Sequence, residues 1–168
     1  MNVKQKLTIT IEHIVITSSK SYEQITKLLE EKMMYAIDDT DKLIEQLVRM
    51  KTPWQEASQV IQNQFGKSSF QIFRKIDHGL LLSLAGKPRK AVQYTIGNPL
   101  LAVQMTQLVT AVALYAPFKV AVYEDDNNGS VIIYDELASF VSQFHNEELI
   151  QLAKHVDSSL EALVASIV

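Results

Sequence analysis

Between residues 70 and 134 the chain alternates short apolar runs with turn signals, an order typical of a small domain that mixes helices and strands. The last part is the clearest: residues 118–122 alternate apolar with polar or small side chains, and Asn128-Gly129 precedes another apolar run at 131–134. Asn-Gly between two such runs is the strongest short signal for a β-hairpin, because both residues tolerate positive φ. We therefore expect an antiparallel hairpin here.

Two further strands precede the hairpin, and each ends at a turn signal. Residues 70–76 lead to Asp77-His78-Gly79, and residues 92–96 lead to Gly97-Asn98-Pro99. Asn is a preferred N-cap and Pro a preferred first helical residue, so an apolar helix is expected from Asn98 through Tyr115.

Periodicity predicts the elements of the first half. Leu7 to Ile16 alternates in a way that predicts a half-buried strand, with a bulge near His13 where the phase changes. Ser21-Tyr22-Glu23-Gln24 fits a capping box that starts a helix. Residues 34–66 carry further helical spacing and predict a pair of helices before the next strand.

A long helix is expected near the end of the chain, starting after Asn146. Its apolar residues alternate by four and three positions, which is the spacing of a coiled-coil seam and requires a cover. We favour packing of this seam on its own domain, with a dimer contact as the alternative. The seam residues are Leu149, Ala153, Val156, Leu160, Leu163 and Ile167.

Composition limits the classes of function. With 168 residues, 47% of them hydrophobic, the chain suits one domain with a sizeable core. A net charge of −3 gives no electrostatic reason to expect nucleic acid as a partner. The most apolar segment, residues 100–118, is interrupted by polar residues, so no membrane span is expected. The absence of cysteine excludes thiolate chemistry and suits a cytoplasmic location.

The order and spacing of these motifs also resemble a known family. The matching pieces are Lys75-Ile76-Asp77-His78, Gly97-Asn98-Pro99, Pro117-Phe118-Lys119-Val120-Ala121-Val122-Tyr123-Glu124-Asp125, Gly129 and Tyr134. On these residues, and on its opening strand and helix, the chain resembles the widespread prokaryotic family of domains of unknown function 302. The resemblance implies an α+β fold, a small antiparallel β-sheet packed against helices, and it brings no established activity.

Compared with that family, the chain has two additions. The family-like core covers residues 7–33 and 67–145, whereas 34–66 stands out as an inserted helical pair and 146–168 as a C-terminal helical extension. With no repeat and no Gly/Ser-rich linker, we expect residues 1–168 to form a single domain.

Asp77 and His78 are the sharpest chemical candidates. A carboxylate can orient or charge an imidazole, and Gly79 lets other groups approach closely. The same residues also serve simply to cap and reverse a chain, and we favour that structural role. The other histidines are isolated in sequence and show no His-x-x-x-His spacing, so no metal site is expected.

Gly97, Asn98 and Glu124 complete the candidate ligand-binding residues. The helix N-terminus after Gly97-Asn98 could present free amides to an anion, although turn chemistry alone also explains these residues. Glu124 ends its strand, where it could meet His78 or Lys119 across the sheet or remain solvated.

These observations support two hypotheses from different classes. The first is a cytoplasmic, non-catalytic ligand-binding or homo-oligomeric interaction module without a cofactor, with a small molecule or an anion as ligand. Its homodimer would form through helical surfaces of residues 34–66 or of the seam. The alternative is an enzyme or small-anion receptor whose cleft combines the Asp77-His78 turn, the Gly97-Asn98-Pro99 turn and Glu124. Convergence of these three features in one pocket would favour the alternative, and their separation would exclude that cleft.

Overall fold

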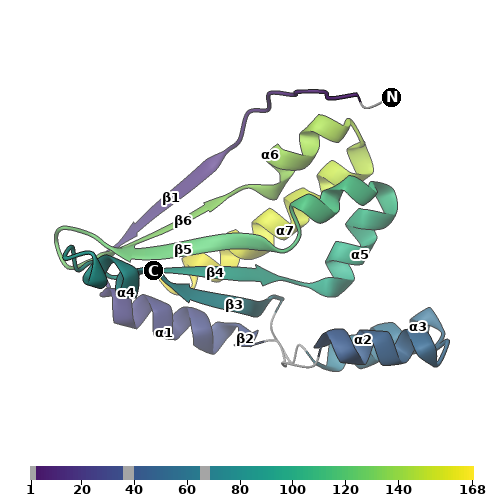
Figure 1. Ribbon diagram of the computed structural model, residues 1–168, viewed down its shortest axis with the longest axis horizontal. Helices are drawn as coiled ribbons and strands as arrows, with labels where there is room; N and C mark the ends of the chain where they lie inside the picture. The colour runs from purple at the N-terminus through teal and green to yellow at the C-terminus, as the bar shows by residue number, and fades with distance from the viewer. Residues whose placement is uncertain (1–2, 36–39, 65–68) are drawn as a thin grey trace.

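The computed structural model describes residues 3–35, 40–64 and 69–168. These residues form a six-stranded sheet with helices along one face and at its ends (Figure 1). In chain order the elements are β1 (His13–Ser18), α1 (Tyr22–Lys32), β2 (Met34–Tyr35), α2 (Thr40–Arg49), α3 (Trp54–Asn63), β3 (Gln71–Asp77), α4 (His78–Leu84), β4 (Ala91–Gly97), α5 (Pro99–Leu108), the 3-10 helix η1 (Thr110–Leu114), β5 (Phe118–Glu124), β6 (Ser130–Asp135), α6 (Leu137–Val141), the 3-10 helix η2 (Ser142–Phe144) and α7 (Glu147–Ala165).

The strands lie in the order β1-β6-β5-β4-β3-β2. Neighbouring strands pair antiparallel, except that the short β2 runs parallel to β3. The fold is therefore α+β with a mainly antiparallel sheet, and the predicted fold class is confirmed.

The predicted hairpin is confirmed as β5 and β6. Glu124 pairs with Ser130 at its closed end. Asn128 adopts a φ of 61°, a left-handed conformation that Asn tolerates better than most residues. A Cβ atom on Gly129 would lie 2.6 Å from the backbone oxygen of Ser18, so only glycine fits where the hairpin tip meets the end of β1.

One face of the sheet carries the hydrophobic core. Side chains alternate along β4 and β5, so that every second residue is buried beneath the helices. The buried sides of α1 and α7 join the same cluster, and α7 passes behind the strands in the view of Figure 1. The cluster includes Ile25, Leu29, Val92, Tyr94, Ile96, Val120, Val122, Ile132 and Leu160.

The seam of α7 belongs to this core. Five of its six residues are buried, and Leu163 is partly buried against the same cluster. The favoured expectation, that the seam packs on its own domain, is confirmed. The alternative of a dimer contact through the seam is wrong, because the sheet and α6 of the same chain already cover it.

The first strand is shorter and later than its sequence pattern predicts. β1 spans His13–Ser18, whereas residues 3–12 belong to no helix or strand. The reason lies in the neighbouring strand: β6 ends at Asp135, and the last bond between the two segments runs from the Glu136 amide to the Glu12 carbonyl oxygen at 2.9 Å. Before Glu12 none of the described strands lies beside this segment.

The helix after Asn98 is also shorter than expected. α5 ends at Leu108, because Val109 adopts an extended conformation with φ of −145° and a 3-10 helix follows. Among the described residues, no helix combines the length and the apolar character needed to cross a membrane.

The predicted helical pair appears as α2 and α3, of which the structure describes residues 40–64. They lie at one end of the molecule beside α5 (Figure 1). α2 buries none of its described residues, whereas α3 buries Ala57 and Ile61. The pair therefore adds little to the core but flanks the end of the sheet where β4 leads into α5.

Candidate functional site

The five candidate residues do not converge on one cleft. Asp77 pairs with Val92 at one end of β4, whereas Gly97 pairs with Gln71 at the other end. Five steps along an extended strand separate these ends by about 17 Å. Glu124 lies at the Asp77 end, where both residues line a pocket of about 350 Å³. The single cleft of the alternative hypothesis is therefore not formed.

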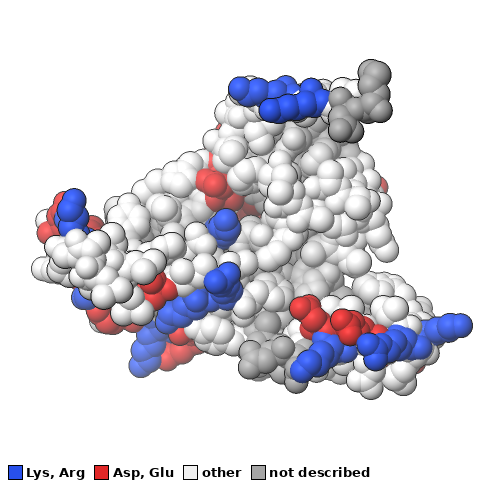
Figure 2. Space-filling model, in the orientation of Figure 1, with Lys and Arg blue, Asp and Glu red and all other residues white. Residues whose placement is uncertain are grey.

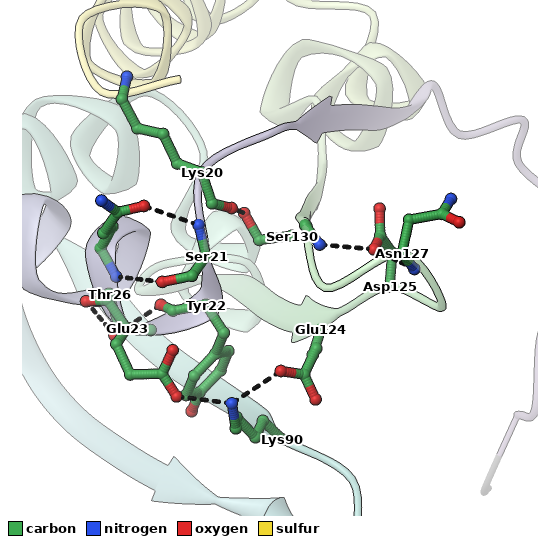
Figure 3. A network of polar contacts seen from close by, with 12 residues as sticks. Lys20, Ser21, Tyr22, Glu23, Thr26, Lys90, Glu124, Asp125, Asn127 and Ser130 are labelled. Carbon is green, nitrogen blue, oxygen red and sulfur yellow. Dashed lines mark hydrogen bonds and ion pairs between the residues drawn. The ribbon is translucent and has the colours of Figure 1, made fainter.

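The Asp77 end carries a polar cluster around Lys90. The Lys90 Nζ lies 2.7 Å from Glu23 Oε1 and 2.7 Å from Glu124 Oε1. Figure 3 shows Lys90 between these carboxylates, which come from the start of α1 and the end of β5, with Tyr22 alongside. The cluster thus ties three segments together and leaves Lys90 paired on two sides.

Lys90, Glu23 and Tyr22 each keep one protonation state near pH 7. Hydrogen bonds to Glu124 and then to Glu23 raise the pKa of Lys90 above its ordinary value. The hydrogen bond from Lys90 lowers the pKa of Glu23. Burial, followed by the nearby charge of Asp77, raises the pKa of Tyr22 to about 12. A general acid or base needs a pKa near the working pH, and none of these three groups has one.

Asp77 and His78 do not form a dyad. Asp77 is the N-cap of α4, and its Oδ1 accepts a hydrogen bond from the Leu80 amide at 3.2 Å. His78 is exposed, and within the described part of the chain its ring has no hydrogen-bond partner. The carboxylate starts a helix and does not orient the imidazole.

Gly97 and Asn98 begin α5. The Asn98 Oδ1 accepts hydrogen bonds from the Leu100 amide at 2.9 Å and from the next amide at 3.4 Å, while Nδ2 donates to the Ser69 carbonyl oxygen at 3.1 Å. These amides are therefore already bonded and not free for an anion. A Cβ atom on Gly97 would lie 3.2 Å from the Phe73 ring, so glycine allows that ring to close against the turn.

A cavity of about 230 Å³ lies at the Gly97 end of the sheet. Its walls come from α2, β3, the β4–α5 turn, α5, the loop before β5, the start of β5 and α7. Thr40, Asp41 and Asn98 supply polar groups, and none of the described lining residues is basic. The apolar wall consists of Ile44, Phe70, Phe73, Pro99, Leu101, Ala102, Met105, Ala116, Pro117, Phe118 and Val156. Such a lining suits an uncharged ligand.

The sequence analysis identified Gly97 and Asn98 as candidate ligand-binding residues but did not predict this cavity or its aromatic wall. One signal was available, because residues 100–108 are apolar on more than one side of their helix. A helix of this kind has a second surface to cover besides the one that faces the core. Which other residues would meet that surface depends on the tertiary arrangement.

A partly buried polar contact between α1 and the sheet was also missed. Tyr94 is fully buried and donates to Glu30 Oε1 at 2.6 Å, and Lys75 Nζ lies 2.7 Å from the same oxygen. Burial acts to raise the pKa of Glu30, but hydrogen bonds from Lys75, Tyr94 and Tyr35 outweigh it and leave that pKa below its ordinary value. Burial, followed by the bond to Glu30, raises the pKa of Tyr94. Glu30 is therefore ionised and Tyr94 protonated at neutral pH.

Tyr94→Phe removes the hydrogen bond to Glu30 and keeps the ring in the core. We expect it to lower the free energy of unfolding at pH 7 by about 1.5 kcal/mol, a typical value for a bond to a charged group.

The Glu30 contact should also make the stability depend on pH. Because the folded-state pKa of Glu30 is depressed, the stabilisation by its carboxylate is complete above the unfolded-state pKa and is lost as pH falls through the folded-state pKa. Urea unfolding measured at pH 7 and at pH 3 gives the change in the free energy of unfolding between the two pH values. This free energy should fall more for wild type than for Glu30→Gln when the pH is lowered.

Tyr123→Phe is the matched control, since that ring is exposed and lies on the opposite face of the sheet. It should change the free energy of unfolding by less than about 0.5 kcal/mol. Equal losses for the two Tyr→Phe variants would contradict a stabilising role for the Glu30 contact.

Comparisons with known proteins agree with this fold. The family model described as "Domain of unknown function DUF302" matches residues 46–167, a range that includes α3 and α7. A crystal structure of an uncharacterized conserved protein DUF302 from Bacillus stearothermophilus aligns with a TM-score of 0.65 and 16% sequence identity, covering 93% of this chain and 98% of that chain. This likeness shows a shared fold. In the comparison with curated proteins, none matched.

Proposed function

This chain belongs to the DUF302 family of domains of unknown function, and from that premise we propose that it is a non-catalytic ligand-binding module whose site is the cavity between α2 and α5. One observation carries the proposal: a space of about 230 Å³ is walled by three phenylalanine rings, with no basic residue in its described lining. The lack of cysteine suits a reducing compartment, so we assign the module to the cytoplasm.

The size and charge of the cavity indicate the class of ligand. A dry apolar cavity of about 150 Å³ in another protein binds benzene, so the larger space here suits a substituted ring or a short branched chain. Asp41 is a charged member of the described lining and would repel an anion. The ligand is therefore a small, mainly apolar molecule without negative charge.

The polar end of the sheet supports the non-catalytic part of the proposal. Arg89 pairs with Asp126 at 2.7 Å, and Lys90 is held by two carboxylates. An incoming anion would have to compete with these bonds. The polar cluster therefore joins α1 to the β5–β6 hairpin, and we place no substrate there.

N-phenyl-1-naphthylamine, a neutral apolar fluorophore, is a suitable probe of the cavity. We expect its fluorescence to rise on binding and to saturate at one site per chain. Ala102→Phe places a ring in the space that the probe would occupy, because Ala102 lines the cavity from α5. It should weaken probe binding by about tenfold or more, since the bulk excludes the ligand directly. A fluorescence titration measures the dissociation constants of the probe for wild type and for Ala102→Phe.

Ala111→Phe is the matched control, because Ala111 is exposed in η1 and does not line the cavity. Probe affinity should be unchanged in this variant. Thermal unfolding should show that both variants remain folded. Binding that is equally strong in Ala102→Phe, or no saturable binding by wild type, would overturn the cavity as the ligand site.

A further inference from the structure

Residues 3–12 contain the alternating pattern of a strand, but among the described residues no strand pairs with them. Leu7, Ile9 and Ile11 alternate with polar residues, as they would in a half-buried strand. In the structure Leu7 is 63% exposed and Ile11 is 40% exposed. The segment leaves β1 and runs past the end of the sheet (Figure 1). Ile9, between Leu7 and Ile11, is partly buried, so the described part of the chain covers this apolar side only in part.

β1 lies at the edge of the sheet, where a strand from a second chain could supply this cover. β1 is an edge strand, with β6 as its neighbour in the sheet. Its ladder stops at Glu12, because β6 gives way to α6 at Leu137. An edge with unpaired amides and carbonyls is a ready template for a strand from another chain.

The segment is complementary to itself when it runs antiparallel to a second copy. With Ile9 opposite Ile9, Thr8 faces Thr10 and Leu7 faces Ile11. In the same register Lys6 faces Glu12, so each end of the pairing brings opposite charges together. Apolar residues thus meet apolar residues on one side of the ribbon, and polar or charged residues meet on the other.

Other registers match less completely. Pairing centred on Thr8 keeps opposite charges at Lys4 and Glu12 but sets the polar Gln5 opposite Ile11. Pairing centred on Thr10 sets Lys6 opposite Ile14. Parallel pairing sets Lys6 against Lys6, and like charges directly opposite one another are destabilising. The match therefore favours the antiparallel register centred on Ile9, in which no polar residue faces an apolar one between Lys6 and Glu12.

The charged ends are available for this contact. Lys6 and Glu12 are both exposed, and within the described residues neither side chain has an ion-pair partner. Figure 2 shows basic side chains on the N-terminal segment at the upper edge of the face in view. A two-fold axis would form the Lys6–Glu12 pair twice.

We propose that this segment is a homodimer interface, in which residues 6–12 of two copies of this chain pair as antiparallel strands about a two-fold axis at Ile9. The contact joins two folded domains through β1 and leaves their sheets and cores unchanged. It is independent of the ligand proposed for the cavity.

Charge reversal tests the register in the full-length protein. Lys6→Glu sets a carboxylate opposite Glu12 twice per dimer, and Glu12→Lys sets an ammonium opposite Lys6 twice. Each single variant should lower the dimer association constant by about tenfold, measured by sedimentation equilibrium. The double variant Lys6→Glu/Glu12→Lys restores opposite charges and should recover the wild-type constant. Lys4→Glu makes the same change of charge opposite Ile14 and should have a smaller effect.

A cysteine cross-link tests the two-fold axis, and the chain has no native cysteine to interfere. Directly opposite residues in an antiparallel pair have Cα atoms about 4.5–5.5 Å apart, within reach of a disulfide. Ile9→Cys should therefore form a covalent dimer under mild oxidation. Thr8→Cys faces Thr10 and should cross-link far less.

Three results would overturn the proposal: a wild-type protein that stays monomeric at high concentration, a dimer insensitive to both charge reversals, or equal cross-linking of Thr8→Cys and Ile9→Cys. Circular dichroism should show unchanged folding in every variant, because residues 6–12 lie outside the core. The probe titration of the cavity is read separately, so failure of one proposal does not resemble failure of the other.

Discussion

Leu160→Glu is expected to abolish cooperative folding. Leu160 is buried in the core where α7 packs on the sheet, and the new carboxylate would have no ion-pair partner there. An unpaired charge in an apolar core costs more than the lost packing alone, and we expect the free energy of unfolding to fall by more than about 4 kcal/mol. That is a large share of the roughly 5–15 kcal/mol that stabilises an ordinary domain. Chemical unfolding followed by circular dichroism should show a lost or strongly shifted transition.

Ala162→Glu is the control on the same helix, because Ala162 is exposed. Its free energy of unfolding should lie within about 0.5 kcal/mol of the wild-type value. A folded Leu160→Glu variant that differed only in its state of association would mean that the seam of α7 is an intersubunit surface. The burial of five seam residues within one chain predicts the opposite.

Phe70→Ala is expected to have the second largest effect. The Phe70 ring is fully buried and meets the Phe118 ring edge-on, with centroids 5.5 Å apart and an interplanar angle of 88°. Truncation removes this contact and leaves a void, so the free energy of unfolding should fall by about 3–5 kcal/mol. Urea titration of the two proteins, compared by midpoint and slope, measures the difference.

Phe73→Ala provides a closely matched comparison. Phe73 also lines the cavity but is 38% exposed, so its truncation should destabilise the fold by less than about 1.5 kcal/mol. It should nevertheless weaken binding of the neutral fluorophore, because it removes part of the aromatic wall. Similar destabilisation by the two Phe→Ala changes would contradict the distinction between core ring and cavity ring.

The polar cluster and the cavity lie at opposite ends of β4, and this separation decides how the chain can act. Asp77 and Glu124 lie at the end where carboxylates bind Lys90, whereas Gly97 and Asn98 line the mainly apolar cavity at the other end. A reaction that needed all four residues has no common site. Binding of an apolar molecule needs only one end.

Much of the local structure follows from nearby residues. The Ser21 capping box is present as predicted, with the Gln24 side chain bonded back to the Ser21 amide at 2.9 Å. Asn98 caps α5 with Pro99 in its first turn, and Asn128-Gly129 closes the hairpin. These signals act over a few residues, because a cap or a turn satisfies backbone groups that are close along the chain.

Patterns that need a partner were less reliable guides. Leu7 to Ile11 alternate as a strand would, yet a strand forms only where another lies beside it, and β6 ends too early to serve. The α7 seam had the spacing of a coiled coil, but a sheet of the same chain covers it. An amphipathic pattern shows that a surface will be covered and does not name what covers it.

The sequence by itself determined where the capped helices and the β5–β6 hairpin lie, and that the chain would combine an antiparallel sheet with helices. Only the tertiary structure decided which distant residues meet. Tyr94 reaches Glu30 across 64 positions, the cavity gathers residues from α2 to α7, and Asp77 is carried away from Gly97 by the length of β4. The physical reason is range: capping and turn formation depend on neighbours in the chain, whereas a site depends on how whole elements pack.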